Sequence, residues 1–219
     1  MSDDALLAVA RAMADLHHPV KTEIAEWAAR TIATHDRVDA DLRSAFAADD
    51  WKRCADRGIH GVMVPTALGG SGADLATTLL TLEGLGQGCR DNGLAFAIGS
   101  QILSTQETIV RFGSEQQQRE WIPPLIAGDV LGAFAMTEPD SGSDAYSLST
   151  TAERRDDGSY VLNGHKAYLT LGSRCALVIV FASTKPGAGA WGLSTFLVPT
   201  DLDGVERLEN RDKMGMRTT

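Results

Sequence analysis

The 219-residue sequence predicts an α+β protein in which an all-α N-terminal domain precedes a β domain. As far as residue 126, apolar residues recur at steps of three and four, which is typical of helices with a buried face. Beyond Leu131 they fall in short β-rich runs separated by turn residues. We therefore place a boundary near Asp129, with a helical domain over residues 1–129 and a β domain over residues 130–219.

The first part of the helical domain is predicted from spacing and from caps. Apolar residues follow helical spacing through residues 6–32. Asp36 is a candidate N-cap for the segment that follows it, because its side chain can accept from the first free backbone N–H groups. A short helix is expected over residues 51–57, and Gly58 is expected to end it.

The second part contains a structured loop and the most apolar helices. Residues 69–72 read Gly-Gly-Ser-Gly and predict a packed loop; they lack the preceding strand and the lysine of a phosphate-binding P-loop. Residues 73–85 and 93–112 are apolar on more than one face, which predicts helices buried inside a bundle. Ser114 is expected to cap the next helix, which continues through Ile126.

The β domain is predicted from β-rich runs and turn sequences. Asp-Asp-Gly-Ser at residues 156–159 and Asn-Gly at residues 163–164 are typical of hairpin turns. The runs that we expect to form strands are 160–162, 168–170, 176–181 and 193–198.

Composition narrows the functional class. The formal net charge of −9 disfavours non-specific nucleic-acid binding, which needs a basic surface. No apolar run approaches the ~20 residues of a membrane-spanning helix, and the acidic start of the chain leads into an amphipathic stretch, unlike a signal peptide. We therefore expect a cytoplasmic protein without membrane insertion.

Cysteine and histidine usage indicates no metal site. The three cysteines have no CxxC spacing, so we expect buried thiols in a reducing compartment. His17 and His18 lack a neighbouring ligand cluster, and His35 and His60 carry no functional signal. Among the histidines, only His165 is a candidate for a place near a cofactor or substrate, because it sits in a predicted hairpin. The four tryptophans are expected in the core or at domain contacts.

The most informative motif is Ala-Phe-Ala-Met-Thr-Glu-Pro-Asp-Ser-Gly-Ser-Asp at residues 133–144. An apolar strand is expected to stop near Pro139, because proline cannot donate a further ladder hydrogen bond. The chain then enters a Gly/Ser/Asp turn, whose backbone N–H groups and hydroxyls can point at a ligand.

This motif resembles the signature of the acyl-CoA dehydrogenase flavoproteins. The Val-Pro…Gly-Gly loop at residues 64–70, the Phe-Gly-Ser-Glu-Gln helix start at 112–116 and Asn-Gly-His-Lys at 163–166 follow the family order. The resemblance covers essentially the whole chain and includes the closing residues 213–219. It implies an antiparallel, barrel-like β domain, incomplete at its C-terminal end, and the cofactor FAD.

The resemblance also implies the site residues. Residues along the flavin include Thr137, which is similar to the family threonine that bonds the pyrimidine side, and Thr170, which matches the one near the reactive nitrogen. Ser143 is the expected contact to the acyl thioester, and Tyr168 stands where tryptophan is usual. Asp140 and Ser141 depart from the frequent Gly-Ala, which makes a standard fatty acyl substrate less certain. The residues expected to contact the cofactor are Phe134, Ala135, Met136, Thr137, Gly142, Ser143, Tyr168, Leu169 and Thr170.

No catalytic base is assigned in this chain. In the family the base is a glutamate on a C-terminal helical bundle, which these residues do not include. Glu138 is expected to be structural, because it abuts a proline in a turn, and the helical acids Glu83, Glu107 and Glu120 are expected to be surface or pairing charges. Either the sequence is part of a longer protein, which we favour, or another chain supplies the bundle.

The resemblance implies a dehydrogenase that introduces an α,β double bond into an acyl-CoA or another acyl thioester. The expected partners are an electron-accepting flavoprotein and either further copies of the chain, as a homo-oligomer, or a chain that supplies the helical bundle. Three alternatives keep the fold: a flavin oxidase or monooxygenase, a dehydrogenase for acyl groups on a carrier protein, and a non-catalytic partner-binding subunit. The sequence leaves open the acyl chain, the carrier and the electron acceptor.

Overall fold

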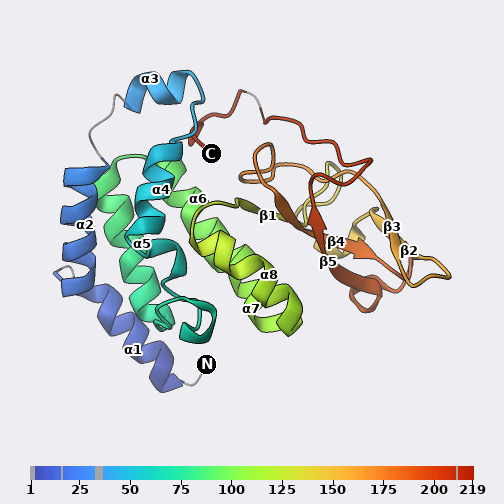
Figure 1. The fold of residues 1–219 in the computed structure, drawn as a ribbon, viewed down its shortest axis with the longest axis horizontal. Helices are drawn as coiled ribbons and strands as arrows, with labels where there is room; N and C mark the ends of the chain where they lie inside the picture. The colour runs from blue at the N-terminus through green and yellow to red at the C-terminus, as the bar shows by residue number, and fades with distance from the viewer. Residues whose placement is uncertain (1–2, 16, 33–36, 211) are drawn as a thin grey trace. The chain divides into compact units, whose positions relative to one another are not determined.

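The computed structural model describes residues 3–15, 17–32, 37–210 and 212–219 (Figure 1). The expected cap Asp36 lies outside these residues, as does His35. The chain divides into two compact units, one of Met1–Asp129 with Asp212–Thr219 and the other of Val130–Arg211. In this division the closing segment groups with the helical unit, where the Thr218 hydroxyl donates to the Asp91 carboxylate at 2.7 Å.

The helical unit consists of helices joined by short loops and single 3₁₀ turns. Ser114 caps α8 as expected: its hydroxyl accepts from the Gln117 N–H, and the Gln117 side chain accepts from the Ser114 N–H, which completes a capping box. Gly58 follows α4 with φ of 84°, as a helix-ending glycine should. The α-helices are α1 (Asp3–Ala14), α2 (Pro19–Thr31), α3 (Arg37–Leu42), α4 (Ala48–Asp56), α5 (Leu75–Cys89), α6 (Asn92–Ser100), α7 (Glu107–Phe112) and α8 (Glu115–Ile126).

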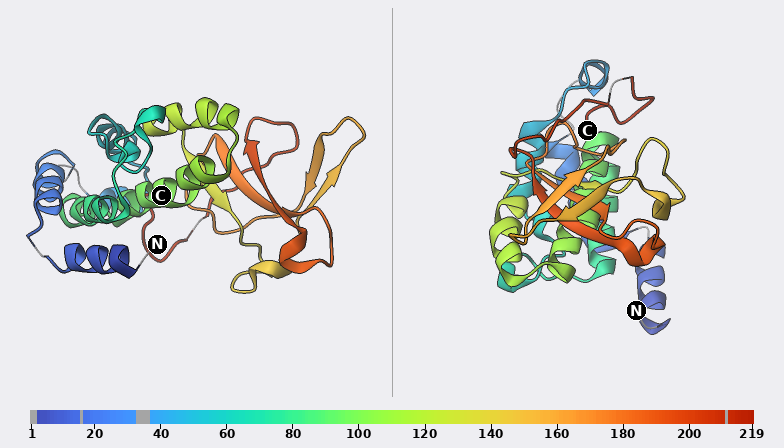
Figure 2. Two further views of the ribbon diagram at one scale, coloured as in Figure 1. Left: turned by 90° about the horizontal axis from the view of Figure 1, so that it is seen from below. Right: turned by 90° about the vertical axis from the view of Figure 1, so that its right-hand side faces the viewer.

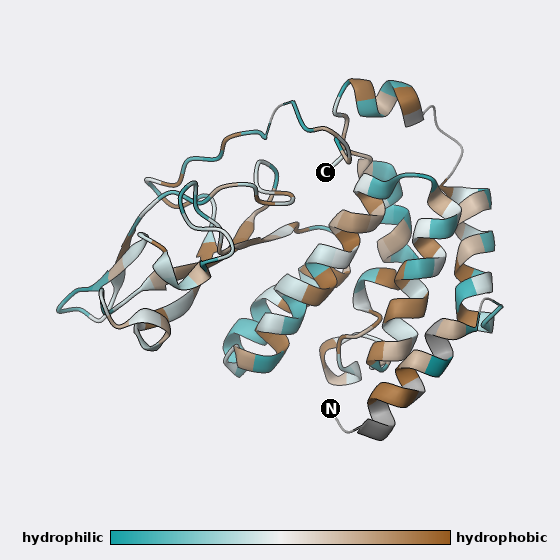
Figure 3. Cartoon of the chain, turned by 180° about the vertical axis from the view of Figure 1, so that it is seen from behind, coloured by the Kyte–Doolittle hydropathy of each residue, from teal (hydrophilic) through white to brown (hydrophobic). Residues whose placement is uncertain are grey.

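Helices α2 and α5 pack closely against each other, and glycines permit that approach. A Cβ atom at Gly84 would lie 2.5 Å from the Lys21 carbonyl oxygen, and one at Gly88 would lie 2.2 Å from the Ala25 carbonyl oxygen. The Lys21 ammonium, almost fully buried, donates to Glu83 of α5 at 3.1 Å. In Figure 3 the helices of this unit carry hydrophobic and hydrophilic segments in alternation, as expected when one face is buried.

A π-helical segment, η3 (Gln101–Gln106), joins α6 to α7, so the predicted helix over 93–112 is continuous but not uniformly α-helical. The segment buries polar side chains. The Gln101 amide donates to the Leu125 carbonyl, whereas the buried Thr105 hydroxyl and Gln106 amide have no hydrogen-bond partner within the described residues. Such π segments interrupt the 3.6-residue repeat on which the sequence prediction depends.

The β unit is built around β4, which pairs along both of its edges (Figure 2). One edge pairs antiparallel with β5 over its whole length; the other pairs parallel with β1 and then, at Ser183, parallel with Thr151 of β2. Strands β2 and β3 form the hairpin predicted at residues 156–159. The strands are β1 (Gly132–Ala135), β2 (Thr151–Arg154), β3 (Tyr160–Asn163), β4 (Leu177–Ser183) and β5 (Leu193–Pro199).

The order of a helical domain followed by a β domain is therefore as expected, but the antiparallel, barrel-like arrangement is corrected. The sheet is mixed and does not close. The reason is that long excursions separate β1 from β2 and β3 from β4, which allows strands to return in parallel, whereas short hairpins enforce antiparallel pairing.

The strand expected at residues 168–170 is also corrected. Tyr168 has φ of 59° and Leu171 has φ of 63°, so this segment is a turn. Asn163 is the last residue of β3, and the Asn-Gly pair at residues 163–164 therefore leads into a loop instead of a hairpin. The β propensity of Tyr-Leu-Thr is overridden by tertiary contacts, because the preceding Lys166 and Ala167 are bound to Glu138 and to the Thr137 carbonyl.

The core of the β unit consists of small and branched side chains, including Ala133, Ala135, Cys175 and Val178. Cys54, Cys89 and Cys175, all in the described part of the chain, are buried, and none forms a disulfide. Trp191 is 95% exposed and therefore does not lie in the core, which leaves a domain contact as the open part of its expectation.

The described residues contain neither a membrane-spanning helix nor a clustered metal-ligand set. No helix among them has the length and apolar character needed to cross a bilayer. No group of three or more His, Cys, Asp or Glu side chains among them is arranged to hold a metal ion.

Candidate functional site

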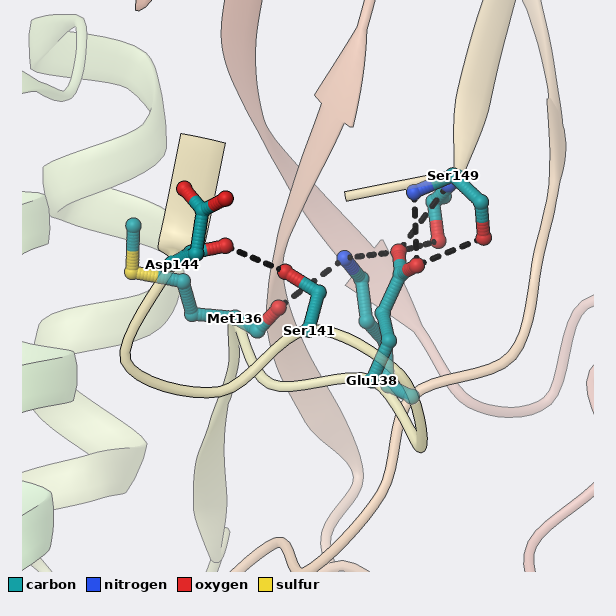
Figure 4. A network of polar contacts seen from close by, with 7 residues as sticks. Met136, Glu138, Ser141, Asp144 and Ser149 are labelled. Carbon is teal, nitrogen blue, oxygen red and sulfur yellow. Dashed lines mark hydrogen bonds and ion pairs between the residues drawn. The ribbon is translucent and has the colours of Figure 1, made fainter. Parts of the chain in front are cut away.

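The Thr-Glu-Pro motif forms a tight turn after a parallel strand. Strand β1 ends at Ala135, although Pro139 by itself would allow the strand to continue as far as Glu138. The Glu138 N–H donates to the Ser141 carbonyl at 2.9 Å, and the Ser141 N–H donates back to the Glu138 carbonyl at 3.2 Å. The Ser141 hydroxyl donates to the Asp144 carbonyl at 2.7 Å and braces the following loop (Figure 4). Pro139 thus occupies a turn position that suits its fixed φ.

The Glu138 carboxylate lies at the centre of this turn and is 3% exposed. One oxygen accepts from the Ser149 N–H and hydroxyl, both at 2.6 Å. The other accepts from the Thr150 N–H at 2.9 Å, from the Thr150 hydroxyl, and from the Lys166 ammonium at 2.9 Å. Burial alone would raise the pKa of Glu138, but hydrogen bonds from Ser149, Thr150 and Lys166 outweigh it and hold the pKa well below its usual value. The structural role expected of Glu138 is therefore confirmed.

Lys166 connects this turn to the loop after β3. Its side chain is 9% exposed, and its ammonium donates to the Met136 carbonyl at 3.2 Å as well as to Glu138. Figure 4 shows the Met136 carbonyl and the Glu138 carboxylate flanking the donor nitrogen. The neighbouring Ala167 N–H donates to the Thr137 carbonyl at 2.9 Å. The backbone carbonyls of Met136 and Thr137 thus both accept hydrogen bonds from residues 166–167.

These bonds bring together the two segments that the sequence assigned to the cofactor. Residues 134–137 precede the turn, and residues 168–170 directly follow Ala167. Leu169 packs against the core cluster that contains Ala133 and Ala135. The two segments therefore lie side by side in the β unit, although more than 30 positions separate Thr137 from Tyr168 in the sequence.

The turn at residues 168–171 displays Tyr168. Its side chain is 76% exposed, and its φ of 59° places it in the left-handed region, where a bulky residue is rarely found. Leu171, also at positive φ, is buried. Positive φ at bulky residues is a form of local strain that concentrates at functional sites. The exposed aromatic ring thus stands on a strained turn.

The remaining candidates differ in exposure. Phe134 is half-buried and contacts Phe181, with ring centroids 5.1 Å apart. Gly142 and Ser143 are exposed, and a Cβ atom at Gly142 would meet nothing within 4 Å. The hydroxyls of Thr137, Ser143 and Thr170 have no hydrogen-bond partner within the described residues. The β unit thus combines an exposed aromatic ring, unpaired hydroxyls and an open glycine.

This donor set fits a flavin. A planar aromatic ring system needs apolar or aromatic cover on its face and donors at its polar edge. Tyr168 and Leu169 offer the first kind of group, and the unpaired hydroxyls of Thr137 and Thr170 offer the second.

Sequence reasoning missed three residues of this region. Lys166 belongs to the Asn-Gly-His-Lys motif, which predicts no role for it, and no motif marks Ser149 or Thr150. The available signal was Glu138 itself, because a carboxylate between an apolar strand and a proline needs donors from elsewhere in the chain. Nothing in the sequence identifies which donors those are.

A cavity of about 180 Å³ also lies in the β unit, and it contains none of the nine predicted cofactor residues. It opens beside the 3₁₀ turns η4 (Ala145–Ser147) and η5 (Gly189–Gly192). Its lining residues are Tyr146, Leu148, Ser149, Thr151, Ser183, Pro186, Gly187, Gly189 and Leu193.

Comparison with known proteins places this geometry in a family. The chain matches the sequence model of the acyl-CoA dehydrogenase N-terminal domain over residues 14–129 and that of the middle domain over residues 133–219. The chain belongs to the acyl-CoA dehydrogenase family.

Three relatives illustrate its range. Isovaleryl-CoA dehydrogenase, mitochondrial, of Oryza sativa subsp. japonica is 33% identical over 93% of this chain and 49% of its own length. The crystal structure of a prolyl acyl carrier protein oxidase has 38% identity and a TM-score of 0.87, covering 91% of this chain and 52% of that one. The structure of PigA with FAD and proline has 32% identity and a TM-score of 0.75, covering 85% and 49%. The chain thus spans about half the length of the relatives that it matches.

Proposed function

We propose that the protein takes part in the FAD-dependent dehydrogenation of an acyl thioester, in which an α,β double bond is introduced. The observation that carries this proposal is the pair of hydrogen bonds from Lys166 and Ala167 to the Met136 and Thr137 carbonyls. These bonds join the two segments that would hold a flavin. Membership of the acyl-CoA dehydrogenase family and the FAD complex of a relative support the same cofactor.

The candidate cofactor residues of the β unit have proposed roles. Residues 134–137 and Leu169 would provide the apolar wall against which the flavin ring lies, and Tyr168 would cover a further part of the ring. The hydroxyls of Thr137 and Thr170 would donate to its polar atoms, and those bonds strengthen as negative charge develops on the ring. FAD, when bound, supplies the redox chemistry by accepting the hydride.

The substrate would meet the exposed loop after the turn. Ser143 is the proposed contact to the thioester, because its hydroxyl is exposed and the neighbouring Gly142 leaves space for close approach. Asp140, three residues earlier in the same loop, is also exposed. A positively charged or polar acyl group would be accommodated better there than an aliphatic chain.

We infer that the proton-abstracting base comes from outside these 219 residues. Glu138 is committed to its hydrogen bonds and is too weak a base, since hydrogen bonding holds its pKa low. We propose that further polypeptide, in the same chain or in a partner chain, supplies the base and completes an oligomer. A cytoplasmic location and an electron-accepting flavoprotein partner belong to the same proposal.

The test uses the purified native protein. We expect a yellow protein with stoichiometric FAD whose colour bleaches when an acyl thioester is added without oxygen. Product analysis under air and under argon separates a dehydrogenase from an oxidase or monooxygenase. A colourless protein that ignores added FAD would contradict the proposal and favour a non-catalytic partner-binding subunit, which has no need of the flavin.

A second candidate substrate is a prolyl group carried by a carrier protein. A prolyl acyl carrier protein oxidase has 38% identity to this chain, which favours this class, and the Asp140 carboxylate is compatible with a cationic amine. Prolyl-loaded carrier protein and a panel of acyl-CoAs, offered in parallel, decide between the substrates. Bleaching by the acyl-CoAs alone would reject the carrier-bound substrate.

A further inference from the structure

One buried carboxylate ties together three separate segments of the β unit. Glu138 follows β1, Ser149 and Thr150 precede β2, and Lys166 lies in the loop after β3. The loop that displays Gly142 and Ser143 begins and ends at this carboxylate. The turn that displays Tyr168 begins two residues after Lys166.

A buried ion pair is a poor device for stability alone. Removing both charges from water costs several kcal/mol, so a well-packed apolar pair is often equally stable. What the pair fixes is geometry, because the Lys166 ammonium has a backbone carbonyl and a carboxylate as its two acceptors. The Met136 carbonyl cannot rotate without losing a charge-assisted hydrogen bond.

We propose that Lys166 and Glu138 form a positioning pair that holds residues 136–137 and the Tyr168 turn in the register that binds the flavin. The proposal rests on the proposed function, since it concerns the same cofactor. Neither residue is assigned contact with the flavin or the substrate. Both act through the backbone carbonyls and through the loops that they anchor.

This arrangement explains why the strained turn persists. Tyr168 and Leu171 both adopt positive φ, a cost of about 1–2 kcal/mol for each residue. The nearby Ala167 N–H is held on the Thr137 carbonyl and Lys166 is held on Glu138, so the chain enters the turn from a fixed point. Without that anchor the turn can relax to negative φ and move the aromatic ring.

The experiment compares Lys166→Met, Glu138→Gln and the double replacement in the native protein. We expect Lys166→Met to weaken FAD binding about 10- to 100-fold, because a buried charge-assisted hydrogen bond that holds residues 136–137 is lost. The visible spectrum and the midpoint potential of the bound flavin should also shift. The double replacement should lose less affinity than the product of the two single losses, because the two residues form one unit.

Lys52→Met is the matched control, and Lys166→Arg is the rescue variant. The Lys52 ammonium also bridges a backbone carbonyl, that of Ala127 at 2.9 Å, and carboxylates, but it does so in the helical unit. The control should leave FAD affinity and the flavin spectrum unchanged, and Lys166→Arg should restore part of the affinity and most of the spectrum.

The outcomes separate the two proposals. If the wild-type protein binds no FAD, both proposals are overturned. If the wild type binds FAD and Lys166→Met binds it with equal affinity, spectrum and potential, the positioning pair alone is overturned. If Lys166→Met does not fold, the double replacement decides, because it removes both charges. A folded double variant with weakened FAD binding supports the positioning pair. A double variant that binds FAD normally, or that does not fold, overturns it.

Discussion

His60 lies edge-on against Trp51 in the core of the helical unit, with ring centroids 4.4 Å apart and planes inclined by 72°. His60 is fully buried, and neither ring nitrogen has a hydrogen-bond partner within the described residues. The Trp51 indole donates to the Gly128 carbonyl at 3.2 Å. Burial lowers the pKa of His60 from 6.5 to about 4, because a charged imidazole would lose its hydration there.

This burial predicts that the unfolding free energy depends on pH. Because the pKa is lower in the folded state, stability is fully present above about pH 6.5 and is lost as the pH falls towards 4. The loss amounts to about 3 kcal/mol. His60→Phe should flatten the dependence of the unfolding free energy on pH between pH 6.5 and 4.5. The pH-dependent contribution of Glu138 to stability falls below this window. Urea unfolding at stepped pH measures it, and parallel profiles for the two proteins would contradict the prediction.

Two glycines of α5 should respond oppositely to alanine. At Gly88 a Cβ atom would lie 2.2 Å from the Ala25 carbonyl oxygen and 2.8 Å from the Ala28 Cβ, so Gly88→Ala must separate α2 from α5. We expect a loss of about 1–3 kcal/mol. Nothing lies within 4 Å of such an atom at Gly86, and Gly86→Ala should gain up to about 1 kcal/mol from helix propensity. Thermal unfolding compares them; losses of similar size would reject the close-approach argument.

Tyr168 should show opposing effects on stability and on binding. Tyr168→Gly removes the cost of a positive φ, so the unfolding free energy should stay level or rise by up to about 1 kcal/mol, while FAD affinity falls. Tyr160→Gly is the matched control. Tyr160 lies in β3 with its ring 5.1 Å from that of Phe196, so its removal should destabilise the unit. Chemical denaturation and FAD titration of both variants test this; a marked destabilisation by Tyr168→Gly would count against a strained turn.

The capping box of α8 should be measurable in isolation. Ser114→Ala leaves the Gln117 N–H without its partner and should lower the unfolding free energy by about 1 kcal/mol. Ser114→Asp keeps an acceptor and adds a negative charge at the helix N-terminus, so it should restore most of the loss. Equal stability of the alanine and aspartate variants would exclude a capping contribution.

Local signals in the sequence were sufficient where one short segment determines its own structure. Ser114 and Gly58 mark helix ends through side-chain acceptors and backbone freedom, and the turn at residues 156–159 fixes the β2–β3 hairpin. Glu138 was correctly expected to be structural from its place beside a proline.

The parts that sequence could not predict depend on distant contacts. The turn at Tyr168 has strand-like composition, and it departs from a strand because residues 166–167 are bound to residues 136–138. The π segment Gln101–Gln106 shifts the phase of a helix whose apolar residues are dense on several faces. Because the apolar pattern has no single face, the spacing of apolar residues does not predict this shift. Parallel pairing of β1 with β4 likewise depends on the length of the excursion between them.

Burial of Cys54, Cys89 and Cys175 has a practical consequence. Burial raises the pKa of Cys175 to about 11, and it also raises that of Cys54, so these side chains stay protonated near neutral pH and react slowly with maleimides. A cysteine placed at the fully accessible Trp191 would then be labelled selectively with a fluorophore. Site-directed labelling within these 219 residues thus requires no prior removal of Cys54, Cys89 or Cys175.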